Sequence, residues 1–352
     1  MKITILSQNL ASIDINDNHN DIFTDTFNKI KPDIYVEFTQ EDNREINDSS
    51  LIDNRLLDGY NNLCVEALSP KQHFNIITKV YSNSDTFIKN KSGHVEINKF
   101  SGTFTSGIES TLGRLIKYAT KGASWVLIKN TSNPNINILF VNLHLPIDTG
   151  KFSFFKNASL GNKYRVQSMV SCLKIILKEI KDTLDIKYLK IFIGGDLNFR
   201  VIDGIDQLSL FLEEDAELSE KTFPFIELSN NLGSTCKYLP TCDIDRTDKE
   251  ECLDSKRSPS RCDRILTNVP LSNLKILKEN NFVMNPLLDH NAIILSVYVS
   301  ELHRVGINRF EKKPSPNKES PNEGGRYKKT RKYKKTKKFK KTKKYITTRK
   351  KL

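Results

Sequence analysis

Gly194-Gly195-Asp196-Leu197-Asn198-Phe199-Arg200 is the stretch of this sequence that decides the fold. The apolar run Leu189–Ile193 leads directly into it, and short apolar runs of this kind predict buried strands. The two glycines allow the backbone to turn tightly or to approach a ligand closely. The strand therefore delivers a carboxylate, an amide and a guanidinium to one point. This combination suits phosphate-ester hydrolysis, and a polar turn is the structural alternative.

Further polar residues stand at the ends of other predicted strands. They are Asn9, Glu41, His144, the pair Asp263-Arg264 and the pair Asp289-His290. Glutamate and amide oxygens are ligands that Mg²⁺ takes in proteins, so Glu41 and Asn9 are candidates for a magnesium site. Taken singly, each residue has a structural alternative: a solvated surface carboxylate, a structural histidine or a polar turn.

Hydrophobic periodicity predicts strands and helices that alternate from Ile3 to Val299 without a linker, which indicates one α/β domain. The predicted helices are 21–31, 50–58 and 164–184. The predicted strands are 3–9, 33–38, 62–68, 74–81, 125–129, 136–145, 189–193, 262–267, 274–277 and 292–299. The polar segment 82–110 is expected to form a long loop or irregular strands.

The order of the strand-end residues, namely Asn, Gln-Glu, His, Gly-Asp-x-Asn, Asp-Arg and Asp-His, resembles the endonuclease/exonuclease/phosphatase superfamily. Within it, Gly195–Arg200 is similar to the Gly-Asp-Leu-Asn-aromatic-Arg signature of the inositol polyphosphate 5-phosphatases. Pro259 and Cys262–Leu266 are similar to that family's second signature, Pro-x-Trp-Cys-Asp-Arg-Ile-Leu. The resemblance covers Ile3 to about Val299 and implies the DNase-I-like four-layered α/β sandwich.

Two departures from the family pattern leave the specificity for inositol lipids open. Arg261 stands where the family usually has Trp, and Leu288-Asp289-His290-Asn291 replaces Ser-Asp-His followed by a basic residue. Thr120-Lys121-Gly122-Ala123 is similar to the family's Asn-Lys-Gly segment.

The resemblance also implies roles for individual residues. One Mg²⁺ would be held by Glu41 with help from Asn9. Asp196 would orient or deprotonate the attacking water, and Asn198 would position it. His290, braced by Asp263, would bind a phosphoryl oxygen opposite His144, and Asp289 would steer the metal or its waters. The cations implied for substrate phosphates are Lys121, Arg200, Arg257 and Arg264.

The implied reaction is Mg²⁺-dependent removal of the 5-phosphate from phosphoinositides or soluble inositol polyphosphates. Two alternatives remain. The first is a Mg²⁺-dependent nuclease or DNA-end phosphodiesterase of the same superfamily, whose basic tail holds nucleic acid. The second is an inactive phosphatase domain that only tethers partners. The second signature favours the phosphatase, because the superfamily's nucleases lack it.

The net charge of +13 comes from one end of the chain. Residues 326–352 contain 16 Lys and Arg and no acidic residue, whereas the remainder has 39 basic and 42 acidic residues. The tail repeats a six-residue unit that starts at Tyr327, Tyr333, Phe339 and Tyr345, and such a block is expected to be disordered. The predicted organisation is a catalytic domain over 1–300, a flexible linker over 301–325 and the tail over 326–352. The tail suits nucleic acid or an anionic membrane surface.

Six cysteines in 352 residues, irregularly spaced, indicate ordinary reduced thiols rather than a disulfide scaffold or a paired zinc site. This favours a cytoplasmic or nuclear setting, with peripheral membrane contact through the tail as one option. The start of the chain lacks the apolar core of a signal peptide, and no apolar stretch approaches the length of a membrane span.

Overall fold

The computed structural model describes a defined part of the chain. The described residues are 1–11, 20–44, 50–52, 54–69, 75–97, 121–146, 158–184, 188–199, 201–202, 205–206, 208, 225–229, 262–277, 290 and 292–300. The chain divides into two units, Met1–Glu311 and Lys312–Leu352. The second unit lies outside the described residues, as do the predicted linker and tail.

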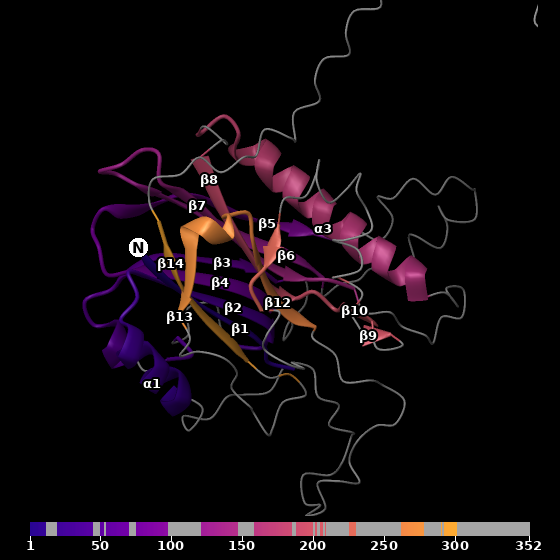
Figure 1. The fold of residues 1–352 in the computed structure, drawn as a ribbon, viewed down its shortest axis with the longest axis horizontal. Helices are drawn as coiled ribbons and strands as arrows, with labels where there is room; N and C mark the ends of the chain where they lie inside the picture. Colours follow the sequence, from indigo (N-terminus) through magenta and orange to yellow (C-terminus); the bar gives the residue numbers. More distant parts are fainter. Residues whose placement is uncertain are drawn as a thin grey trace, which may run out of the picture. The chain divides into compact units, whose positions relative to one another are not determined.

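Two six-stranded mixed sheets form the body of the first unit (Figure 1). Sheet A has the strand order β13-β14-β1-β2-β4-β3, and sheet B has the order β11-β12-β8-β7-β6-β5. The strands of sheet A are β1 (Lys2–Asn9), β2 (Ile34–Asp42), β3 (Asn61–Leu68), β4 (Asn75–Ser82), β13 (Leu274–Leu277) and β14 (Ile293–Val299). The strands of sheet B are β5 (Phe87–Glu96), β6 (Gly122–Asn130), β7 (Asn137–His144), β8 (Leu189–Asp196), β11 (Ile226–Glu227) and β12 (Asp263–Thr267). β9 (Val201–Ile202) pairs with β10 (Ile205–Asp206).

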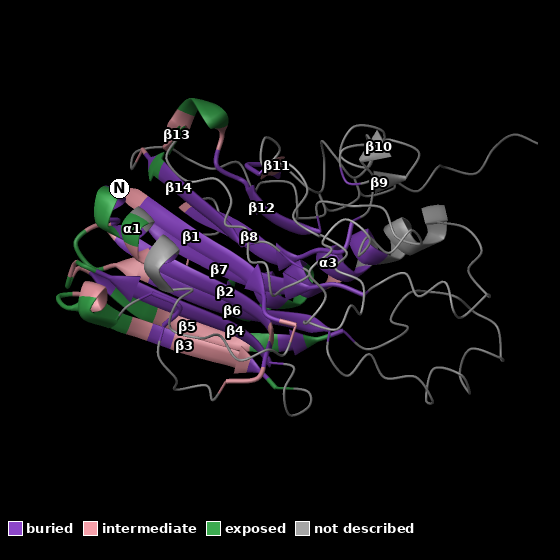
Figure 2. Ribbon diagram, turned by 90° about the horizontal axis from the view of Figure 1, so that it is seen from below, coloured by how far each residue is buried: buried purple, intermediate pink, exposed green. Residues whose placement is uncertain are grey.

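Three apolar clusters define the layers. Side chains of both sheets, among them Ile5, Phe38 and Phe192, form the core between them. Helix α3 (Ala158–Ile180) packs on the outer face of sheet B, and α1 (Asn20–Ile30) packs on the outer face of sheet A. The result is the four-layered sandwich of the DNase-I-like fold. The central strands are buried on both faces (Figure 2), which explains why their apolar side chains are not confined to alternate positions.

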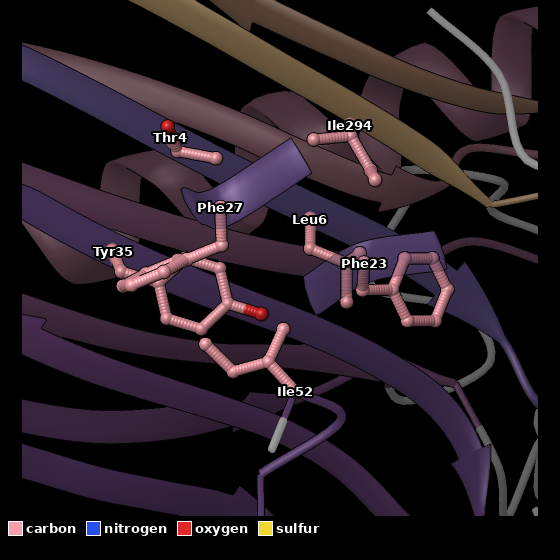
Figure 3. Close-up of a pocket in the computed structure, with 7 residues that line it drawn as sticks. All are labelled: Thr4, Leu6, Phe23, Phe27, Tyr35, Ile52 and Ile294. Carbon is pink, nitrogen blue, oxygen red and sulfur yellow. The ribbon is translucent and has the colours of Figure 1, made fainter. Parts of the chain in front are cut away.

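A small, largely apolar pocket lies where α1 packs on sheet A (Figure 3). Its lining residues are Thr4, Leu6, Phe23, Phe27, Tyr35, Ile52 and Ile294. The pocket contains none of the polar residues predicted to carry chemistry. Within the described ranges, no helix has the length and apolar content that a membrane crossing requires.

One of the predicted elements is wrong. The expected helix 50–58 is only a short 3-10 helix, Asn54–Leu57, and residues 50–52 are not helical, since the Leu51 N–H donates to Glu37 Oε1 of β2 at 2.9 Å. The segment 82–110, expected to form a long loop or irregular strands, contains the ten-residue strand β5, which fits the second of these options. β5 is an edge strand with a register shift between Lys89 and Lys91, which interrupts the alternation that would have revealed it.

Candidate active site

Strand direction brings the strand-end residues to one end of the two sheets. β1 is parallel to β2, and β7 is parallel to β8, so their last residues lie at corresponding edges. β12 runs antiparallel to β8, and β14 runs antiparallel to β1, so their first residues lie at the same edges. Residues that are far apart in sequence therefore meet: Asp263 pairs directly with Asp196, and His144 pairs with Asp196 on the other side.

Asp196 lies at the centre of this group, and only 1% of the residue is exposed. Its Oδ2 accepts a hydrogen bond from Asn9 Nδ2 at 3.2 Å, and its Oδ1 accepts one from the backbone N–H of Asn198 at 3.0 Å. The Asn198 amide donates to the Leu145 carbonyl oxygen at 2.8 Å, and its φ of +54° lies in the left-handed region that Asn tolerates. Asn198 thus shapes the turn that holds the Asp196 carboxylate.

His290 and Asp263 form a buried pair beside Asp196. The distance from His290 Nδ1 to Asp263 Oδ2 is 2.7 Å, and His290 Nε2 lies 3.9 Å from Asp196 Oδ2. A carboxylate at Nδ1 favours the tautomer that carries its proton there and orients the ring. The other ring nitrogen, Nε2, therefore faces the Asp196 carboxylate, and in the protonated ring it can donate a hydrogen bond to a phosphoryl oxygen.

Glu41 approaches the group from sheet A. Its Oε1 lies 3.5 Å from His144 Nε2 and 3.7 Å from Lys121 Nζ, and Lys121 Nζ also contacts His144 Nε2. The Glu41 side chain is 22% exposed, whereas those of Asp196 and Asp263 are 2% and 0% exposed, so Glu41 is the most solvent-accessible of these three carboxylates.

The donor chemistry fits a hard cation such as Mg²⁺. Glu41 offers a carboxylate, and Asn9 offers an amide oxygen with two lone pairs, one of which accepts the Ala11 N–H at 2.9 Å. Mg²⁺ usually takes one or two carboxylates, with waters and substrate phosphate at the other positions. No cluster of three or more His, Cys, Asp or Glu side chains arranged for a metal occurs within the described residues.

The backbone at Glu41 departs from regular strand geometry. The pairing of β2 with β4 shifts register between Thr39 and Asp42, and Glu41 has a φ of +50°. The neighbouring Asp42 is buried and accepts hydrogen bonds from Arg44 Nε at 2.9 Å and from Thr39 Oγ1 at 2.7 Å. Burial raises the pKa of the Asp42 carboxyl, but the hydrogen bonds and charge of Arg44, with the Thr39 hydroxyl, outweigh burial and lower it.

This lowered pKa predicts how Asp42 stabilises the fold as a function of pH. Because the pKa is lower in the folded state than in the unfolded chain, the stabilisation is present above the unfolded value of about 3.9. It is lost as the pH falls through the folded pKa. Urea unfolding of the wild type and Asp42→Asn should show a larger difference in unfolding free energy at neutral pH than near pH 3. An equal difference at both pH values would contradict this account.

Arg264 is the predicted phosphate-binding residue that the structure places elsewhere. Adjacent strand residues point to opposite faces, and Asp263 is the one that faces His290. Arg264 is fully buried, and its Nη1 lies 2.9 Å from Glu227 Oε2. We therefore assign Arg264 to the packing of sheet B instead of the substrate site. Three other predicted site residues, Asp289, Arg200 and Arg257, lie outside the described residues.

Two features of the site became clear only in the structure. Gly195 has a φ of +119°, and an added Cβ would overlap the Leu143 carbonyl oxygen, so this glycine is needed for the close approach of β7 and β8. Asn142 is fully buried in β7 and hydrogen-bonds to sheet A. A polar residue inside the apolar run Ile138–Leu143 was the available signal.

Comparison with known proteins gives one family and several distant structures. Endonuclease/Exonuclease/phosphatase family 2 matches residues 6–296. Truncated TDP2 of Caenorhabditis elegans is 14% identical, with a TM-score of 0.46 over 85% of this chain and 98% of that one. The human Nocturnin catalytic domain with bound sulfate is 11% identical, with a TM-score of 0.47 over 85% and 95%. The mannosyl-6-phosphatase Bt3783 of Bacteroides thetaiotaomicron is 14% identical, with a TM-score of 0.44 over 84% and 99%.

No curated protein sequence matches the chain. The family match spans the strands of both sheets that bear the site, from β1 to β14. The chain belongs to the endonuclease/exonuclease/phosphatase family 2, within a superfamily of hydrolytic enzymes that includes phosphodiesterases, nucleases and phosphatases.

Proposed function

We propose that the protein is a Mg²⁺-dependent phosphomonoesterase that removes the 5-phosphate from phosphoinositides or soluble inositol polyphosphates. The observation that carries the proposal is the position of Asp263. This residue belongs to the Cys262–Leu266 stretch that resembles the inositol polyphosphate 5-phosphatases, and its carboxylate lies 2.7 Å from His290 in the cluster around Asp196. The stretch thus contributes directly to the candidate site.

In the proposed mechanism, Glu41 and Asn9 hold the Mg²⁺, which when bound neutralises phosphate charge. Asp196 takes a proton from the attacking water, and its carboxylate is kept in place by Asn9 and by the Asn198 backbone. His290 Nε2–H donates to a non-bridging phosphoryl oxygen as negative charge develops there, while Asp263 stabilises the protonated ring. As the water oxygen bonds to phosphorus, the bond from phosphorus to the inositol 5-oxygen breaks, and this oxygen leaves as a hydroxyl group after it takes a proton from solvent.

Cations complete the proposed substrate site. Lys121 lies beside Glu41 and His144, with 5% of the residue exposed, and is a proposed contact to the substrate phosphate. The remaining proposed contacts to substrate phosphates are Arg200 and Arg257, and Asp289 is the proposed partner of the metal or its waters.

Replacing Glu41 with Gln tests the metal role. We expect Mg²⁺ to raise the melting temperature of the wild type, because a ligand that binds only the folded state stabilises it. Glu41→Gln should lose most of this shift, since it removes the charge that attracts the cation. Glu66→Gln is the control, because it neutralises a carboxylate that lies 3.3 Å from His94 and outside the proposed metal site. This variant should keep the Mg²⁺-induced shift in melting temperature. An unchanged titration of Glu41→Gln would remove Glu41 from the metal site.

The substrate class is tested by phosphate release from a panel in the presence of Mg²⁺. The panel comprises vesicles containing a 5-phosphorylated inositol lipid, soluble inositol polyphosphates, and single- and double-stranded DNA. We expect release from the inositol compounds and no cleavage of DNA. Lipid and soluble substrates are compared at equal phosphate concentration, because either source presents the same 5-phosphate. Cleavage of DNA alone would refute the proposal.

A nuclease or DNA-end phosphodiesterase is the second candidate, and the composition of the basic tail is compatible with it. Its 16 cations bind phosphate polymers with steep salt dependence, and aromatic side chains at every sixth position could stack on bases. The same composition also suits peripheral contact with an anionic membrane, so the tail alone does not choose between the two functions.

A further inference from the structure

We propose that Gln40 and Asn142 are positioning residues that fix the Glu41 turn against the strand bearing His144. This inference rests on the proposed role of Glu41 as a metal ligand. The two side chains connect β2 of sheet A to β7 of sheet B through buried hydrogen bonds, and we call them the Gln40–Asn142 clamp.

Asn142 uses both ends of its amide in the clamp. Its Nδ2 donates to the Thr39 carbonyl oxygen at 3.0 Å and to the Ile77 carbonyl oxygen at 2.8 Å. Its Oδ1 accepts a hydrogen bond from Gln40 Nε2 at 2.7 Å. Gln40 and Asn142 are both fully buried, so water does not compete for these bonds. One side chain of sheet B thus binds three groups of sheet A.

These bonds lie directly beside the irregular backbone. Thr39 and Ile77 form the last regular pair of β2 with β4 before the register shift that contains Glu41. A shift of this kind interrupts the ladder of backbone hydrogen bonds, and the two N–H groups of Asn142 bind the carbonyl oxygens of this last pair, one on β2 and one on β4. A left-handed φ at a non-glycine residue persists only where the surroundings determine it, and the clamp supplies that constraint for Glu41.

Asn142 also adjoins the catalytic strand. Asn142 pairs with Gly194 of β8, and His144, two residues further along β7, pairs with Asp196. Because strand residues two apart point to the same side, Asn142 and His144 share a face of sheet B. A Cβ on Gly195 would lie 2.9 Å from Asn142 Oδ1, which shows how closely this amide approaches the β8 backbone directly before Asp196. The clamp therefore sets the position of Glu41 relative to Asp196.

The chain offers a matched control. Thr78 Oγ1 and Ser124 Oγ lie 2.7 Å apart in another buried hydrogen bond between the two sheets, and neither residue adjoins Glu41. Ser124 pairs with Asn142 across β6 and β7, so Ser124→Ala removes a neighbouring bond between the two sheets while every group of the clamp stays in place.

The test measures the melting temperature of the full chain at increasing Mg²⁺ concentrations. Phosphate release is measured on the same samples. We expect Asn142→Leu to raise the Mg²⁺ concentration of the half-maximal shift about 10-fold or more, as loss of such support to a metal ligand typically does. Gln40→Met, which removes one bond, should raise it less, and Ser124→Ala should leave it within about twofold. Phosphate release should recover at high Mg²⁺ in the clamp variants. Gln40→Met decides the test if Asn142→Leu does not fold.

The inference would be overturned if the clamp variants and Ser124→Ala reached the half-maximal shift in melting temperature at the same Mg²⁺ concentration. If Glu41→Gln loses the shift in the same series, the proposed function stands and only the clamp fails. If Glu41→Gln titrates like the wild type, the metal assignment fails, and the clamp fails with it.

Discussion

Asp196→Asn is expected to lower phosphate release from the inositol substrate by about 10²- to 10⁴-fold, the usual contribution of a general base. The asparagine keeps the shape of the side chain, and its Oδ1 can still accept the Asn198 N–H that lies 3.0 Å from Asp196 Oδ1. It does not take up a proton, and it lacks the negative charge that faces His144 and His290 at 3.5 and 3.9 Å. Initial rates at saturating Mg²⁺ measure the effect.

The control for this variant is Glu66→Gln, which also neutralises one carboxylate but lies outside the cluster. It should retain the wild-type rate, and circular dichroism should show that both variants are folded. A folded Asp196→Asn enzyme that turns over within a few-fold of the wild type would refute the assignment of Asp196 as the group that activates water.

Arg264→Met is expected to destabilise the fold by about 3–5 kcal/mol, because it leaves the Glu227 carboxylate buried without its charged partner. The two side chains are 0% and 1% exposed, so solvent does not compensate for the missing guanidinium. Ser229 Oγ donates to Glu227 Oε1 at 2.9 Å, and this single neutral hydrogen bond does not replace an ion pair. Urea unfolding at neutral pH measures the loss.

The double variant Arg264→Met/Glu227→Leu separates pairing from packing. It removes both charges, so it should recover much of the stability lost in Arg264→Met. If Arg264→Met instead keeps the wild-type unfolding free energy and raises KM for the phosphorylated substrate, Arg264 contacts substrate after all.

Most strands of both sheets were predictable, because each contains a short, buried apolar run. The run Ile191–Ile193 marks β8, and the run Ile293–Leu295 marks β14. β5 was predictable only as one of two options, a loop or irregular strands, since an edge strand with an interrupted register has no continuous pattern. The helix expected over 50–58 failed because the Leu51 N–H donates to the Glu37 carboxylate of β2, a contact that local periodicity does not reveal.

The sequence by itself determined the α/β class, the order of the strand-end residues and the stretch that contains Asp196, because these depend on local composition and spacing. Only the tertiary structure decided that Asp263 faces His290 while the adjacent Arg264 pairs with Glu227. It also decided that Asn142 reaches Thr39 and Gln40 across the sandwich. The physical reason is that strand register and sheet packing select the partner of each buried polar group, and both are set by contacts between residues far apart in the chain.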